Sequence, residues 1–210
     1  MTEMENKAVE YAVQQGVATL TMQSAPVNAL SRAIRVGLIE GINNALDDDS
    51  VRAIVITSSL PIFSGGADIS EFSGGDLSPM LPEVLDKIEN ASKPAVAVLP
   101  GPAFGGGLEV ALACHHRITF VDNKVGLPEV NLGILPGAGG TQRLPRLADA
   151  QTSLEMIVTG KPTSVVKLPG VFDKISDKPE HLLEDTKAYL QALTPDKAIK
   201  RTSDITLSMS

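Results

Sequence analysis

The chain opens with two short runs in which apolar and polar residues alternate. The alternation covers residues 9–13 and again 17–21, with Gln15-Gly16 between the two runs. A period of two is typical of half-buried strands, and a glycine after a polar residue suits the tight turn that joins them. The pattern therefore predicts two antiparallel strands at the start of the fold.

The period then changes from two to about four. Ile34, Leu38 and Ile42 recur every four residues, which is the spacing of an apolar helix face. Ser31 stands where an N-cap is expected, and the acidic run 47–49 follows the last apolar position. We expect a helix between these two points.

From residue 53 onward, apolar strands alternate with glycine-rich loops and helical patterns. The predicted strands cover 53–57, 95–99 and 118–121, the glycine loops cover 64–66 and 101–107, and the helical patterns cover 81–88, 108–114, 152–158 and 180–193. Residues 125–140 are predicted to be a loop. This alternation indicates an α/β fold. We interpret residues 1–193 as one domain and 194–210 as a polar tail for which no regular structure is predicted.

Composition supports a single core of aliphatic residues. The chain has 210 residues, of which 43% are hydrophobic but only 3% aromatic, with no Trp. A core of Val, Ile, Leu and Ala suits parallel strands covered by helices, and the length suits one domain better than two.

Charge and cysteine content exclude several classes of function. A formal net charge of −7 argues against a nucleic-acid-binding surface. The only cysteine, Cys114, excludes an intrachain disulfide and argues against a structural zinc site. We expect His115 and His116, which follow it, to face solvent.

No apolar run reaches the roughly 20 residues of a membrane span, and neither end resembles a secretory or Ser-Lys-Leu targeting signal.

Two glutamates stand alone in apolar, glycine-rich surroundings. Glu109 is the only charged residue between Lys93 and His115, and Glu129 is the only one between Lys124 and Arg143. A buried carboxylate is costly unless it is hydrogen-bonded or protonated. Each could be a structural residue that binds backbone amides. Two such residues beside glycines indicate an acid-base pair instead, with pKa values raised by burial.

Two glycine loops follow predicted strands and lead into helical segments. They are Ser64-Gly65-Gly66-Ala67 and Gly105-Gly106-Gly107. Such loops can be simple tight turns. They can also present backbone N–H groups at a helix N-terminus, and one N–H from each would bind an enolate or thioester oxygen.

Nucleotide-binding alternatives fit less well. The loop at 136–141 lacks the Gly-Lys-Ser/Thr ending of a phosphate-binding loop. The strand and glycine loop at 95–106, with the later strand ending at Asp122, loosely mimic a dinucleotide-binding unit. The helix between them is too short, however, and would leave Glu109 without a role.

These same segments resemble the crotonase (enoyl-CoA hydratase/isomerase) superfamily, and within it the hydratase part of peroxisomal bifunctional hydratase/dehydrogenases. The segments that carry the resemblance are residues 26–30, 64–69, 105–109 and 126–144, and the similarity runs from about Val9 to Asp173. The resemblance implies a spiral of ββα turns. It also implies fatty-acid β-oxidation as the setting and an enoyl-CoA hydratase that adds water to a 2-enoyl-CoA, with a 3,2-enoyl-CoA isomerase activity beside it.

The resemblance also assigns roles to individual residues. It implies that Glu109 deprotonates the water, that Glu129 protonates the α carbon, and that the N–H groups of Ala67 and Gly106 hold the thioester oxygen. The further residues implied in substrate binding are Val27, Asn28, Ala29, Asp68, Ile69, Gly105, Pro128 and Gly137, the last of which helps to hold the water. No cofactor or metal is implied, because the substrate carries coenzyme A.

Partners and location follow from the same resemblance. It implies an acyl-CoA substrate, no nucleic acid or membrane partner, a trimer-based homo-oligomer and a peroxisomal location, with the cytoplasm or mitochondria as alternatives. Relative to this family, the segment 160–173 is short and the C-terminal helical region is truncated after about Leu193. The alternative function is therefore a truncated isoform that binds acyl-CoA with little turnover.

Overall fold

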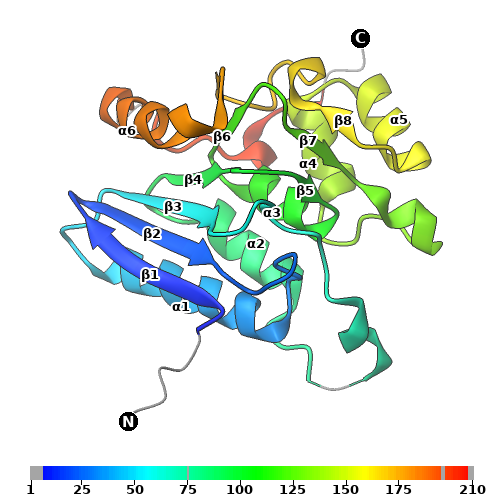
Figure 1. Cartoon of the computed structure of the whole chain (residues 1–210), viewed down its shortest axis with the longest axis horizontal. Helices are drawn as coiled ribbons and strands as arrows, with labels where there is room; N and C mark the ends of the chain where they lie inside the picture. The colour runs from blue at the N-terminus through cyan, green and yellow to red at the C-terminus, as the bar shows by residue number, and fades with distance from the viewer. Residues whose placement is uncertain (1–6, 75, 195–196, 208–210) are drawn as a thin grey trace.

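The computed structural model describes residues 7–74, 76–194 and 197–207. Its larger sheet has the strand order β1-β2-β3-β4-β6-β9, and a smaller sheet has the order β5-β7-β8. The strands are β1 Val9–Gln14, β2 Val17–Met22, β3 Ala53–Ser58, β4 Ala95–Val98, β5 Ala103–Phe104, β6 His116–Phe120, β7 Lys124–Gly126, β8 Thr163–Ser164 and β9 Lys174–Ser176. Figure 1 shows the two sheets beside each other, with helices packed around them.

The helices lie in the connections between the strands and, for η4, α6 and η5, after the last strand. The α-helices are α1 Arg32–Asp47, α2 Leu81–Glu89, α3 Gly106–Ala113, α4 Gly140–Leu147, α5 Ala150–Thr159 and α6 Leu182–Ala192. The 3₁₀ helices are η1 Ile69–Ser73, η2 Pro128–Leu132, η3 Val165–Lys167, η4 Pro179–His181 and η5 Thr202–Asp204. The predicted α/β class is confirmed.

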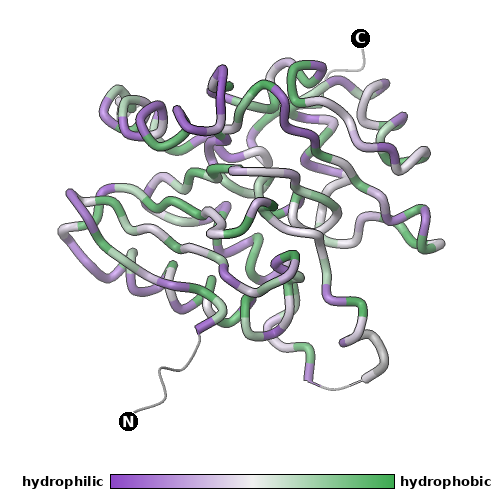
Figure 2. The backbone as a smooth tube through the Cα atoms, viewed as in Figure 1, coloured by the Kyte–Doolittle hydropathy of each residue, from purple (hydrophilic) through white to green (hydrophobic). Residues whose placement is uncertain are grey.

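The pairing of the strands agrees with the sequence pattern. β1 and β2 form the predicted antiparallel hairpin, whereas β2, β3, β4, β6 and β9 run parallel to one another. Figure 2 shows polar residues at the hairpin turn and hydrophobic residues in β3 and β4. Every residue of β4 is buried, because both faces of that strand are covered.

Helices cover the two faces of the larger sheet unequally. Leu20 and Ile54 on one face belong to a large core that includes apolar residues of α1, α2 and α3. Val55 and Val98 on the other face belong to a smaller core with Leu182 and Leu190 of α6. The side chains alternate between these cores because successive residues of a strand point to opposite faces.

Two local predictions differ from the structure. Ser31 precedes α1, but its side chain makes no capping hydrogen bond. The histidines that were expected to face solvent are buried, since His115 is 0% and His116 3% exposed. The His115 ring accepts a hydrogen bond from Ala95 N and its other nitrogen lies 3.0 Å from the Glu89 carbonyl oxygen, so it ties α2 to the start of β4.

The described part of the C-terminal tail, 197–207, packs against the rest of the fold. It contains η5, whose Thr202 hydroxyl donates to the Leu112 carbonyl oxygen at 3.2 Å and is 2% exposed. The carbonyl oxygen of Ala198 lies 3.1 Å from His116 Nε2. These contacts place the segment over α3 and β6.

Candidate active site

The first glycine loop is braced from within by Asn28. This residue is fully buried, and its side-chain amide donates to Ser58 Oγ at 2.7 Å and to the Phe63 carbonyl oxygen at 3.2 Å. Its Oδ1 accepts from Ser24 N at 2.7 Å. Asn28 therefore links residues 24, 58 and 63 through its side chain. Of its neighbours in the segment implied to line the CoA channel, Val27 is 39% exposed and Ala29 is half-buried.

The two glycine loops lie directly against each other. Ser64 forms a parallel bridge with Ala103, and Phe104 N donates to the Ser64 carbonyl oxygen at 2.9 Å. A Cβ atom at Gly107 would lie 2.6 Å from Ser64 Cβ. Only glycine allows this approach, so the sequence Gly105-Gly106-Gly107 brings the start of α3 next to residues 64–67.

Two backbone N–H groups from these loops are free and close together. A Cβ atom at Gly106 would lie 3.4 Å from Ala67 N, and one at Gly66 would lie 3.4 Å from Gly106 N. Within the part of the chain that the structure describes, neither Ala67 N nor Gly106 N has a hydrogen-bond acceptor. Two adjacent donors, one of them in the first turn of α3, can bind a developing oxyanion.

Glu109 lies on α3, about one turn after the donor Gly106. It is 2% exposed, and its Oε1 accepts from Ala138 N at 2.9 Å and from Gly140 N at 2.7 Å. Burial raises the pKa of Glu109, and the two N–H groups and the charge of Arg143 only partly oppose this effect. The raised pKa makes the carboxyl group better suited to exchange a proton than an ordinary glutamate.

Glu129 reaches the same place from η2. It is 9% exposed, its Oε2 has no hydrogen-bond partner in the described chain, and a Cβ atom at Gly105 would lie 2.9 Å from its Oε1. Burial raises the pKa of Glu129, and the negative charge of Glu109 raises it further. The structure thus gathers two buried carboxyl groups beside a pair of free N–H donors.

The remaining predicted residues lie around this centre in different ways. Gly137 is exposed at the start of the loop whose N–H groups bind Glu109, and Pro128 is half-buried beside Glu129. Asp68 caps η1 by accepting from Ser70 N at 3.0 Å, and Ile69 is 61% exposed. The structure brings Gly105 and Pro128 to Glu129, whereas Asp68 and Ile69 belong to an outer segment.

Sequence reasoning missed the residues that support Glu109. Ala138 and Gly140 donate to its carboxylate, and Arg143 and Glu89 lie behind them as an ion pair of 2.8 Å. One signal was available, because Arg143 is the charged residue that ends the apolar stretch around Glu129. Among the described residues, no group of His, Cys, Asp and Glu side chains could hold a metal ion, and no helix is long and apolar enough to cross a membrane.

The chain is similar to curated proteins that differ in length, and it covers a different share of each. A segment of 169 residues, 79% of this chain, is 47% identical to the peroxisomal bifunctional enzyme of Danio rerio and covers 23% of that protein. A segment of 164 residues, 75% of this chain, is 46% identical to a probable enoyl-CoA hydratase of Bacillus subtilis and covers 64% of it. The chain therefore spans about a quarter of the first relative and just under two thirds of the second.

Solved structures share the fold. The chain superposes on enoyl-CoA hydratase subunit I of Geobacillus kaustophilus with a TM-score of 0.80 and 31% identity, covering 88% of this chain and 74% of that one. It superposes on DspI of Pseudomonas aeruginosa with a TM-score of 0.81 and 29% identity, covering 90% of this chain and 76% of that one. The predicted crotonase-like fold is confirmed. Because the profile described as "Enoyl-CoA hydratase/isomerase" matches residues 12–205, the chain belongs to the enoyl-CoA hydratase/isomerase family.

Proposed function

We propose that this chain is an enoyl-CoA hydratase that adds water to trans-2-enoyl-CoA and forms 3-hydroxyacyl-CoA in fatty-acid β-oxidation. The observation that carries the proposal is the meeting of Glu109 and Glu129, both buried and both with raised pKa values, beside the free N–H groups of Ala67 and Gly106. Hydration of a conjugated thioester needs these parts: a base for water, an acid for the α carbon and donors for the enolate oxygen.

The proposal divides the reaction among these groups. The N–H groups of Ala67 and Gly106 bind the thioester oxygen and stabilise the enolate, a contribution of about 10²–10³-fold for each such donor. Glu109 takes a proton from water as the water attacks the β carbon, and Glu129 gives a proton to the α carbon. Gly137 N has no acceptor in the described chain and is free to hold the water.

The same site supports isomerisation of 3-enoyl-CoA to 2-enoyl-CoA. That reaction moves a proton between two carbons and consumes no water, so it needs the oxyanion donors and one carboxyl group that can both take and return a proton. Glu129 suits this role because its Oε2 has no protein partner. Glu109, by contrast, is held by two backbone N–H groups.

Substrate, assembly and location belong to the same proposal. The substrate is an acyl-CoA thioester, and the relatives from Danio rerio and Homo sapiens are described as peroxisomal, which favours that compartment. The end of η2, the segment that follows it and the helix α5 carry exposed apolar side chains, which favours a homo-oligomer. These side chains are Leu132, Ile134, Leu135, Leu154 and Val158.

Hydration is tested by following the absorbance of the conjugated enoyl thioester with crotonyl-CoA and with a longer 2-enoyl-CoA. The proposal expects the absorbance to fall with turnover in the ordinary enzymatic range of about 1–10³ per second. Tight binding of both thioesters without loss of absorbance would refute the hydratase. That result would favour the alternative of an acyl-CoA-binding isoform with little turnover.

A further inference from the structure

Behind Glu109 lies an ion pair that the proposed reaction does not use directly. The Arg143 side chain on α4 is 11% exposed and the Glu89 side chain at the end of α2 is 8% exposed. Arg143 donates from Nε at 3.0 Å and from Nη2 at 2.8 Å to the same oxygen, Glu89 Oε2. Two charged hydrogen bonds to one buried oxygen fix the guanidinium plane.

The free end of that guanidinium reaches the loop that binds Glu109. Arg143 Nη1 donates to the Ala138 carbonyl oxygen at 2.9 Å, and the N–H of the same residue, Ala138, donates to Glu109 Oε1 at 2.9 Å. Gly139 lies under the guanidinium with φ +106°, and a Cβ atom there would collide with Arg143 Nη1. Arg143 and the loop therefore fit each other only with glycine at position 139.

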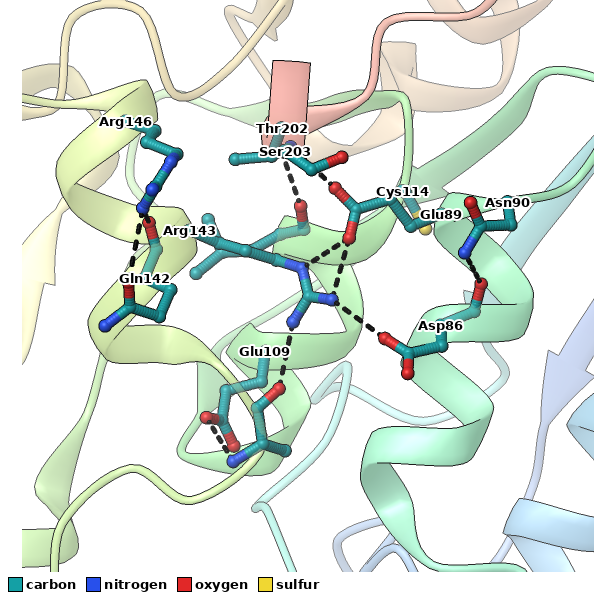
Figure 3. A network of polar contacts seen from close by, with 12 residues as sticks. Asp86, Glu89, Asn90, Glu109, Cys114, Gln142, Arg143, Arg146, Thr202 and Ser203 are labelled. Carbon is teal, nitrogen blue, oxygen red and sulfur yellow. Dashed lines mark hydrogen bonds and ion pairs between the residues drawn. The ribbon is translucent and has the colours of Figure 1, made fainter. Parts of the chain in front are cut away.

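The other oxygen of Glu89 is held by the C-terminal segment. Ser203 N donates to Glu89 Oε1 at 2.8 Å, and its neighbour Thr202 is anchored on α3 through Leu112. Figure 3 shows this series of contacts, with Arg143 between Glu89 and the loop at Glu109. Residues that lie far apart in the sequence thus meet behind one catalytic carboxylate.

We propose that Glu89 and Arg143 are positioning residues that hold the 137–140 loop in place for Glu109, and that the segment around Ser203 completes this support. The inference rests on the proposed function for its kinetic consequence. Without the pair, the Ala138 carbonyl oxygen loses its donor, and the peptide is free to rotate its N–H away from Glu109. Displacement of a catalytic group by about 1 Å costs about 10²-fold in rate.

The electrostatics are consistent with this support. Burial alone would raise the pKa of Glu89, yet the Ser203 N–H and Arg143 together hold the pKa below its usual value, so Glu89 stays ionised. The charge of Arg143 also lowers the pKa of Glu109 against the stronger effect of burial. Removal of Arg143 therefore changes both the position and the proton affinity of Glu109.

The test separates positioning from stability with a double variant. Arg143→Met and Glu89→Gln each leave a buried charge without its partner, so both lower stability as well as kcat. Glu89→Leu/Arg143→Met removes both charges of the pair, so neither partner is left as an unpaired buried charge, and the third contact of Arg143, Asp86, is exposed. Ser203 N and the Ala138 carbonyl oxygen lose their side-chain partners in this variant, so we expect it to unfold below the parent midpoint in urea but above the midpoints of both single variants. Its kcat for crotonyl-CoA should nevertheless stay at least about tenfold below that of the parent, with little change in KM.

Amide exchange of Ala138 and Gly140, measured by NMR, reports the loop directly. We expect faster exchange of both amides in the double variant and in Arg143→Lys, which keeps the charge but replaces three separate nitrogen donors by a single nitrogen. Arg146→Met is the matched control, because Arg146 lies on the same helix and bonds only to Gln142 within the described chain.

The outcomes are distinguishable. Parent kcat together with parent exchange at Ala138 in the double variant and in Arg143→Lys would overturn the positioning role. If the parent chain does not hydrate crotonyl-CoA, the proposed function fails, and the exchange of Ala138 and Gly140 alone then decides whether the ion pair holds the loop. Loss of activity in Arg146→Met equal to that in Arg143→Lys would also contradict the inference.

Discussion

Gly107→Ala tests whether the contact between the two glycine loops creates the oxyanion site. The new methyl group would lie 2.6 Å from Ser64 Cβ and 2.8 Å from the Ser64 carbonyl oxygen. Carbon atoms pack at about 3.5–4.0 Å, so the loops must separate by about 1 Å. The backbone oxygen cannot rotate away, and Ser64 Oγ also accepts from Gly66 N, next to Ala67. The movement therefore reaches the donor at Ala67.

We expect Gly107→Ala to lose about 1–3 kcal/mol of stability through overpacking and about 10²-fold in kcat/KM for crotonyl-CoA. Gly37→Ala is the matched control, because its Cβ would lie 2.9 Å from Val9 Cβ, in a crowded place between α1 and β1 that lies away from the site. Urea unfolding and initial rates are measured on both variants. An unchanged kcat/KM in Gly107→Ala, or an equal loss in Gly37→Ala, would refute the reasoning.

Three further predictions concern Glu129 and its surroundings. Isomerisation of 3-enoyl-CoA should fall more in Glu129→Gln than in Glu109→Gln, and equal losses in the product assay would contradict the division of roles. Burial raises the folded-state pKa of Glu129 above its ordinary value of 4.5. The folded state therefore loses stability as the pH rises from about 4.5 through the raised pKa, because the buried carboxyl group then becomes charged. Glu129→Gln should therefore unfold at higher urea concentration than the parent at pH 7 and at the same concentration near pH 4; lower stability at pH 7 would argue against the buried charge. Gly105 has φ +52°, and a Cβ atom there would lie 2.9 Å from Glu129 Oε1. Gly105→Ala should therefore cost about 1–2 kcal/mol of stability and displace Glu129. A drop in kcat without a matching rise in KM would report that displacement.

Most elements with a clear hydrophobic period were predictable. The hairpin, α1 and the apolar strands β3 and β4 follow from periods of two and four or from continuous apolar runs. Helix α4 was missed between the expected loop, 125–140, and the helix predicted at 152–158, because it starts at Gly140, continues with polar residues and contains Pro145. Strands β7, β8 and β9 have two or three residues each, too few to show any period.

The candidate site also contains residues that the local sequence predicts and residues that only long-range contacts reveal. Glu109 and Glu129 stand out in sequence as single charges in apolar surroundings, and the structure buries both. The Glu89–Arg143 pair joins residues 54 positions apart on two helices, so no local pattern predicts it. The burial of Asn28 was missed for a related reason, since its side-chain amide donates to Ser58 and Phe63, which lie 30 and 35 residues away.

The central claim is that Glu109 and Glu129 together hydrate an enoyl-CoA, and the most direct measurement compares the hydration rate of crotonyl-CoA in the parent, Glu109→Gln and Glu129→Gln. Each replacement keeps the shape of the side chain and removes its acid-base function. We expect each rate to fall at least about 10²-fold while acyl-CoA binding stays close to that of the parent. Turnover at the parent rate in either variant would contradict the account.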